Sequence, residues 1–197
     1  MAGIPTTELT PKVHAAIEML MAEVQRLRED LHQAQQRVGY LEKLADEDSL
    51  VPVANRRAFV RELSRMVAFA ERYGTPSSIL YFDINGFKTI NDQHGHAAGD
   101  AAIKHVAELL TSNVRETDVV GRLGGDEFGV ILAQSDSQTA ADKADALATT
   151  IAANPLDWNE MALALNVAYG TYTITGEENP GEALERADRA MYAQKRA

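Results

Sequence analysis

The sequence contains no cysteine, has only six prolines among 197 residues, and carries no excess of positive charge. The absence of cysteine excludes disulfides and thiolate metal sites, and leaves the redox compartment undetermined. A formal net charge of −10 disfavours broad binding to nucleic acid or to an anionic membrane surface. No apolar run approaches the length of a membrane span, and residues 1–8 show neither a basic leader nor an apolar core, so we expect a cytoplasmic protein.

The remaining composition is ordinary for a folded protein. Hydrophobic residues make up 45% and charged residues 24% of the chain, which is long enough for one catalytic-sized domain and an appendage. The acidic balance still allows a small anionic substrate, because a bound divalent cation supplies local positive charge.

The first part of the chain carries a heptad repeat. Between residues 12 and 45 there is no proline and one glycine, and two apolar series with a spacing of seven interleave at intervals of three and four. The first series is Ile17, Val24, Leu31, Val38 and Ala45, and the second is Val13, Leu20, Leu27, Ala34 and Leu41. Branched residues at most positions of the first series, with Leu at most positions of the second, favour a parallel two-stranded coiled coil.

Charged residues beside these series agree with the parallel arrangement. Glu23 would face Arg28 of a partner chain, and Arg37 would face Glu42. We therefore predict a coiled-coil dimerisation helix over residues 1–46 and a catalytic domain over residues 47–197. A single amphipathic helix packed on its own domain is the alternative.

Beyond Pro52, helical and strand patterns alternate along the sequence. The expected helices are 55–73, 100–113, 139–153 and 180–195. The expected strands are 77–83, 119–120, 130–132 and 162–173. This order predicts an open sheet with helices packed on it, in the α+β class.

The most informative stretch is 121–132, in which two adjacent glycines precede two adjacent carboxylates. Gly124 and Gly125 are expected to form the turn between two strands, with Asp126 and Glu127 at the hairpin tip. A backbone without side chains lets a bulky ligand come close, so the acidic pair beside it indicates metal-assisted chemistry on phosphates. The alternative is an ordinary hairpin turn, because glycine and aspartate are common turn residues.

Other polar residues complete a possible site. Asp83 ends an apolar strand next to the hairpin, where it and Asp126 would offer hard oxygen ligands for Mg²⁺. Lys88 would meet phosphate as a point charge. Asn91 and Asp100 combine an amide with a carboxylate, and this set matches the donors and acceptors of guanine rather than adenine. The alternative, which this segment by itself favours, is a turn with Asp100 as the cap of the helix that follows.

Together these segments resemble the GGDEF family of diguanylate cyclases. Residues 124–128 are that family's signature, residues 83–100 are similar to its upstream element, and residues 187–195 to its C-terminal helix. The resemblance covers about residues 48–195. It implies a palm-like nucleotidyl-cyclase fold, with a central, mostly antiparallel sheet flanked by helices and a GGDEF β-hairpin, here preceded by the long coiled-coil helix.

The resemblance also implies an activity. Such domains condense two GTP molecules into cyclic di-GMP and release two pyrophosphates, acting as a dimer with one GTP per domain and two Mg²⁺ or Mn²⁺ ions per active site. One alternative is a catalytically silent receptor for cyclic di-GMP or GTP that signals through its coiled coil. The intact Asp83, Asp126 and Glu127 argue against the receptor. A pure coiled-coil adaptor would leave the nucleotide motifs unexplained.

Residue roles follow from the same resemblance. The catalytic residues are Asp83, Asp126 and Glu127, and these three with the Ile84 carbonyl are the metal ligands. The GTP contacts are Phe87, Lys88, Asn91, Asp100, Gly124, Gly125 and Lys195. Arg115 and Asp118 resemble the family's inhibitory site for its own product, with a surface salt bridge as the alternative.

The sequence departs from the family pattern at four points. Val51-Pro52 replace its Thr-Gly, Asn85 stands where a second aspartate is frequent, and residues 137–153 contain no arginine to support the inhibitory site. The sequence also ends two residues after Lys195, short of the family's usual basic tail.

Overall fold

The computed structural model describes residues 10–196, and the side chains of residues 40–44 are outside the described part. The chain divides into two compact units, Met1–Ala45 and Asp46–Ala197. Within residues 10–196, none of the helices combines the length and the hydropathy needed to cross a membrane.

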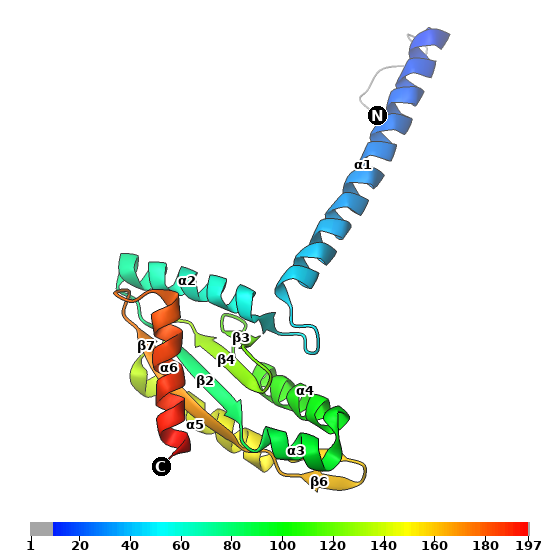
Figure 1. The fold of residues 1–197 in the computed structure, drawn as a ribbon. Coiled ribbons are helices and arrows are strands. Elements are labelled where there is room, and N and C mark those ends of the chain that lie inside the picture. The colour runs from blue at the N-terminus through cyan, green and yellow to red at the C-terminus, as the bar shows by residue number, and fades with distance from the viewer. Residues whose placement is uncertain (1–9, 197) are drawn as a thin grey trace. The chain divides into compact units, whose positions relative to one another are not determined.

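The elements follow one another along the chain as shown in Figure 1. The helices are α1 (Pro11–Asp46), α2 (Arg56–Tyr73), α3 (Phe87–His94), α4 (His96–Ser112), α5 (Ser137–Ala153) and α6 (Pro180–Lys195). The strands are β1 (Ala54–Asn55), β2 (Ser77–Ile84), β3 (Val119–Arg122), β4 (Glu127–Leu132), β5 (Leu156–Trp158), β6 (Met161–Leu163) and β7 (Val167–Ile174).

Five strands form the central sheet, in the order β1-β3-β4-β2-β7. The pair β1–β3 is parallel and the other three pairs are antiparallel, while β5 and β6 form a separate two-stranded sheet. Figure 1 shows α6 in front of the sheet and α5 behind it. The predicted α+β fold, with a mostly antiparallel sheet flanked by helices, is confirmed.

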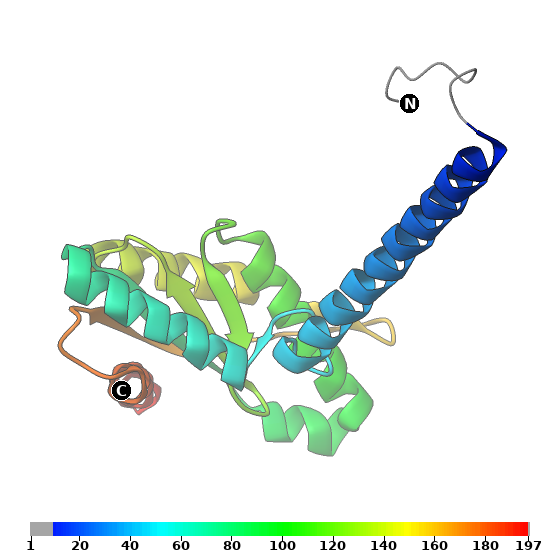
Figure 2. The ribbon, with the colours of Figure 1, turned by 90° about the horizontal axis from the view of Figure 1, so that it is seen from above.

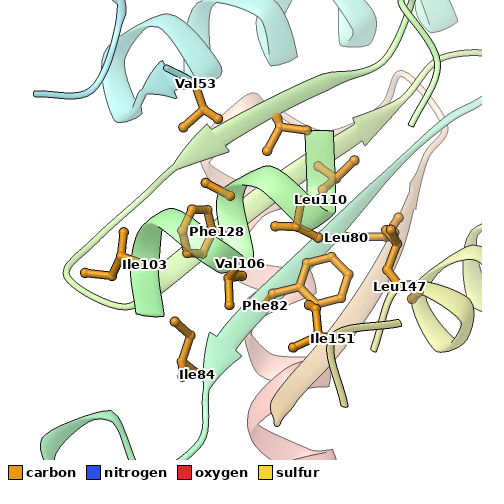
Figure 3. Close-up of a cluster of buried hydrophobic side chains, with 14 of the residues drawn as sticks. Val53, Leu80, Phe82, Ile84, Ile103, Val106, Leu110, Phe128, Leu147 and Ile151 are labelled. Carbon is orange, nitrogen blue, oxygen red and sulfur yellow. The ribbon is translucent and has the colours of Figure 1, made fainter. Parts of the chain in front are cut away.

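The side chains of β2 point alternately to the two faces of the sheet, and the core has one layer on each face. Leu80 and Phe82 point to the face covered by α4 and α5, where they join the buried cluster drawn in Figure 3. Ile79 and Tyr81 point to the opposite face, beneath α2 and α6. Successive side chains of a strand face opposite ways, so a strand buried on both faces has a continuous hydrophobic run, as β2 has from Ile79 to Phe82.

Side-chain caps fix where three of the helices begin. Asn55 Oδ1 accepts from the Ala58 amide of α2 at 2.9 Å, and Asp136 Oδ1 accepts from the Thr139 amide of α5 at 2.8 Å. Asn179 forms a reciprocal capping box with Glu182 in α6. These bonds satisfy amides that have no partner within the helix, and the predicted helices 55–73, 139–153 and 180–195 are confirmed within two residues.

Two local expectations are wrong, and one short helix was not expected. The helix expected from Asp100 begins at His96, so Asp100 lies inside α4, and the region before it contains α3, a helix of 8 residues bounded by Gly86 and Gly95. The strand expected over 162–173 is two strands. Apolar residues continue through Ala164 and Leu165, but the pairing partner changes from β5 to β2 between β6 and β7.

The helix α1 is continuous, and its heptad residues are exposed in the single chain. Leu20, Leu27 and Leu31 are 65%, 53% and 59% exposed. Glu23 pairs with Arg26 of its own helix at 2.6 Å. The side chains of Leu41 and Glu42, which belong to the predicted heptads, are outside the described residues, and the dimer stays a prediction.

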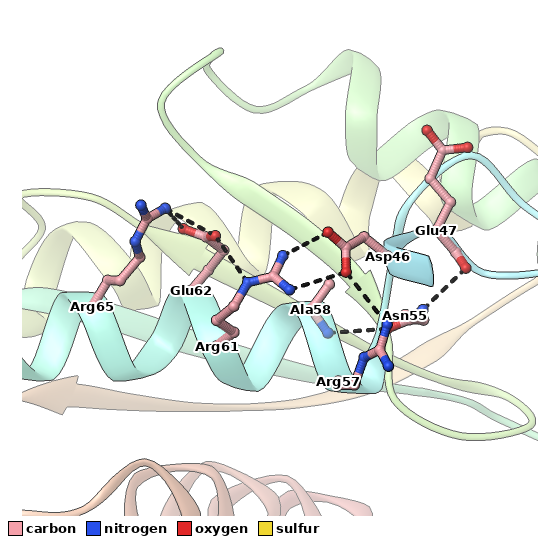
Figure 4. A network of polar contacts seen from close by, with 8 residues as sticks. All are labelled: Asp46, Glu47, Asn55, Arg57, Ala58, Arg61, Glu62 and Arg65. Carbon is pink, nitrogen blue, oxygen red and sulfur yellow. Dashed lines mark hydrogen bonds and ion pairs between the residues drawn. The ribbon is translucent and has the colours of Figure 1, made fainter. Parts of the chain in front are cut away.

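A polar network holds the start of the second unit to α2 (Figure 4). Both carboxylate oxygens of Asp46 accept from Arg61, at 3.0 and 2.8 Å, and Arg57 lies 3.6 Å away. The Asn55 side-chain amide donates to the Glu47 carbonyl at 3.2 Å. The arginine side chains are more than half exposed, so we expect the network to orient this segment more than to stabilise it.

Candidate active site

The two glycines lie in the four-residue connection between β3 and β4. The Leu123 amide donates to the Glu127 carbonyl at 2.8 Å, which closes the predicted hairpin. A Cβ atom added to Gly124 would lie 2.1 Å from Glu127 Oε2, whereas one added to Gly125 would meet open space. The room above Gly124 is therefore taken by the Glu127 carboxylate, and the open approach is at Gly125.

The structure brings Asp83 and Asp126 together at one end of the sheet. Asp83 is the register partner of Glu127, and the Ile84 amide donates to the Asp126 carbonyl at 3.2 Å. Partial burial and then the charge of Asp83 raise the pKa of the Asp126 carboxyl above its ordinary value. Lys195, the last residue of α6, donates from Nζ to Asp83 Oδ1 at 2.5 Å.

This pair of carboxylates fits a hard divalent cation. Two mutually repelling carboxylates are stabilised when a cation binds between them, and their oxygens are the ligands that Mg²⁺ prefers. Across the described part of the chain, however, no three His, Asp or Glu side chains gather as a metal-ligand cluster. The Glu127 carboxylate lies beside Gly124.

Tyr81 is a neighbour of Glu127 that sequence reasoning missed. It is 4% exposed and shares a sheet face with Asp83, two residues further along β2. Burial, the charge of Glu127 and a hydrogen bond to it raise the pKa of the Tyr81 phenol, with a further contribution from Asp188 of α6. The alternation along 77–84 was the available signal, because it places residues 81 and 83 on one face.

Arg122 ties the hairpin to the segment that precedes β1. Its Nε and Nη2 donate to the Gly125 carbonyl at 3.2 and 2.8 Å, and its Nη1 donates to Asp48 Oδ1 at 2.9 Å. Asp48 also accepts from the amides of Leu50 and Val51. Asp48 thereby fixes the loop that contains the Val51-Pro52 departure, and the guanidinium links that loop to the site.

The predicted guanine contacts lie on α3 and α4, which pack against each other. Asn91 Oδ1 would be 2.1 Å from a Cβ atom on Gly99, and the Phe87 ring would be 3.1 Å from it. The missing side chain at Gly99 therefore makes room for the Asn91 amide. Asp100, the next residue, is exposed on α4, and Lys88 is exposed on α3.

Arg115 and Asp118 do not form a salt bridge with each other among the ion pairs of residues 10–196. Asp118 instead accepts from the backbone amides of Arg115 and Ala133, at 3.0 and 3.2 Å. Both residues line a pocket of about 90 Å³ at the start of α5, together with Lys143. Residues 137–153 contain no arginine, but Lys143 places a second cation in this pocket besides Arg115.

A comparison with protein families matches residues 45–197 to the family described as "Diguanylate cyclase, GGDEF domain". Among curated proteins, the chain is 31% identical over 186 residues to diguanylate cyclase DgcP of Pseudomonas aeruginosa, covering 94% of this chain and 28% of that protein. It is 33% identical over 150 residues to diguanylate cyclase DosC of Escherichia coli K12, covering 76% of this chain and 33% of that protein. The chain thus spans a third or less of the length of these relatives.

Two solved structures are similar over both the long helix and the domain. One is the coiled coil and GGDEF domain of DgcB from Caulobacter crescentus in complex with c-di-GMP, with a TM-score of 0.76, 32% identity, and coverage of 93% of this chain and 94% of that one. The other is diguanylate cyclase SiaD in complex with its activator SiaC from Pseudomonas aeruginosa. Its TM-score is 0.77, its identity 26%, and the match covers 94% of this chain and 71% of that one.

Proposed function

This chain belongs to the family of diguanylate cyclases that carry a GGDEF domain, and from that membership we propose that it condenses two GTP molecules into cyclic di-GMP with release of two pyrophosphates. The observation that carries the proposal is the Asp83–Asp126 pair beside the open approach at Gly125. A receptor without catalytic activity has no need of a carboxylate whose pKa is raised by partial burial and by the charge of a neighbouring carboxylate.

In the proposed reaction, the acidic residues at the hairpin serve the attack of a 3′-hydroxyl on an α-phosphorus. Asp83, Asp126, Glu127 and the Ile84 carbonyl would hold two Mg²⁺ or Mn²⁺ ions, which lower the hydroxyl pKa and neutralise phosphate charge when bound. Glu127 also accepts the proton of the attacking hydroxyl. The Tyr81 phenol, whose pKa is raised, stays protonated and available to donate to Glu127.

The remaining contacts position the nucleotide. Asn91 and Asp100 bind the guanine edge, with Phe87 packed behind the Asn91 amide. Lys88 and Lys195 meet the triphosphate, and the space at Gly125 admits it. We further propose that domains 47–197 of two chains face each other with one GTP each, brought together by a parallel coiled coil of the helices in 1–46.

The proposed function is tested by incubating the full chain with GTP and Mg²⁺ and separating the products by chromatography. We expect cyclic di-GMP and two equivalents of pyrophosphate. Bound nucleotide without any cyclic dinucleotide would support the silent receptor instead.

Gly99→Ala is expected to raise the KM for GTP about tenfold, the effect of losing one good polar contact. The added methyl group displaces the Asn91 amide, whose oxygen lies 2.1 Å from its position. Steady-state kinetics measures the effect. Gly39→Ala in α1, where a Cβ atom meets nothing within 4 Å, is the control and should leave KM unchanged.

Arg115→Ala is expected to weaken binding of cyclic di-GMP at least about tenfold, because the guanidinium is the forked cation of its pocket. Lys143→Ala should weaken it less, since an ammonium is a point charge. Calorimetric titration measures both, with Lys104→Ala on α4 as the control. If Arg115→Ala binds like the wild type, the product does not use this pocket.

A further inference from the structure

The helix α6 packs on the edge strand β7 backbone to backbone, but only as far as Met191. A Cβ atom on Gly170 would lie 2.1 Å from the Met191 amide nitrogen and 2.3 Å from the Ala187 carbonyl oxygen. Met191 is 4% exposed, whereas residues 192–196 are all exposed. In Figure 2, α6 is seen nearly end-on beside β7. Burial therefore fixes the helix up to Met191 and leaves its last turn without a packed face.

That last turn carries Lys195, which pairs with Asp83. The last carbonyls of a helix have no amide partner within it, so an unpacked final turn opens easily. Opening moves the Cα atom of Lys195 and carries its ammonium away from the carboxylates. Some contact outside the helix is needed to keep this cation in place.

Gln194 makes such a contact. Its Oε1 accepts from the Tyr169 amide of β7 at 2.7 Å. Because β7 is the edge of the sheet, this amide faces away from β2 and has no strand to bond. Tyr169 is itself held from the other side, since its hydroxyl donates to Asp145 of α5 at 3.1 Å. The bond joins the last turn of α6 to an anchored point of the sheet.

We propose that Gln194 is a positioning residue, which fixes the last turn of α6 so that Lys195 reaches both Asp83 and the substrate triphosphate. Gln194 touches neither the carboxylates nor the nucleotide in this proposal, and acts through Lys195. The inference rests on the proposed function for the role of Lys195 at the triphosphate. The flexible Lys195 side chain passes from Asp83 to phosphate while its Cα atom stays in place.

The test measures nucleotide binding by the full chain, apart from turnover. The probe is a GTP analogue with a methylene group between the α- and β-phosphorus atoms, titrated with Mg²⁺ in a calorimeter. Gln194→Met keeps the length of the side chain and removes the acceptor, and we expect it to weaken binding about three- to tenfold. The control is Gln138→Met on α5, where the Gln138 side chain donates to Asp142 of its own helix, and this variant should bind like the wild type.

A double-mutant cycle separates positioning from a general structural effect. In a Lys195→Ala background, Gln194→Met should change the affinity by less than about twofold, because the residue through which it acts is gone. Equal losses in both backgrounds, or wild-type affinity in Gln194→Met, would overturn the proposal. Wild-type chain that binds the analogue but makes no cyclic di-GMP would overturn the proposed function and leave this inference intact.

Discussion

Asp126→Asn is expected to lower the rate of cyclic di-GMP formation by at least about a thousandfold, because a charge that holds the cations and offsets the phosphates is lost. The amide has the same shape, so folding is retained. Product is measured by chromatography at saturating GTP and Mg²⁺. Asp142→Asn, an exposed change on α5, is the matched control and should keep full turnover. Unchanged turnover in Asp126→Asn would refute the role assigned to this residue.

The same variant should be more stable than the wild type when both are free of metal. The folded protein raises the pKa of Asp126, so its ionised form costs stability that is absent in the unfolded chain. This cost vanishes below the unfolded pKa of about 4 and grows as the pH rises through the raised folded value. With EDTA present, the Tm gain of Asp126→Asn should therefore be largest near neutral pH and shrink as the solution is acidified.

Leu20→Glu is expected to reduce specific activity at least about tenfold at low protein concentration, with recovery as the concentration is raised. In the predicted parallel dimer this change puts two like charges into the apolar seam, where burying them is costly. Sedimentation at the same concentrations should show monomers. Deletion of residues 1–45 should give the same dependence on concentration.

Met19→Glu is the matched control for Leu20→Glu. Met19 adjoins Leu20 in the sequence, belongs to neither heptad series and is 74% exposed, so the same charge there should leave both assembly and turnover unchanged. A specific activity that does not depend on concentration in Leu20→Glu would count against the role given to the coiled coil.

Features that depend on neighbours along the chain could be predicted from the sequence. Seven-residue spacing predicted α1, and apolar periodicity predicted α2, α5 and α6, because periodicity is a local property of the sequence. The hairpin around Gly124 and Gly125 was predictable for the same reason. The short helix α3 and the change of partner between β6 and β7 were missed, since their apolar patterns do not differ from those of a loop or of one continuous strand.

How the site residues meet depends on the packing of strands and helices that are distant in the sequence. Lys195 reaches Asp83 across 112 positions of the sequence, and Arg122 reaches Asp48 across 74. No spacing rule predicts such pairs, because they depend on which strand lies beside which and on how closely a helix approaches the sheet. The sequence supplied the chemical groups of the site. Packing decided that Glu127 lies over Gly124, beside Tyr81, and that Gln194 fastens the turn that carries Lys195.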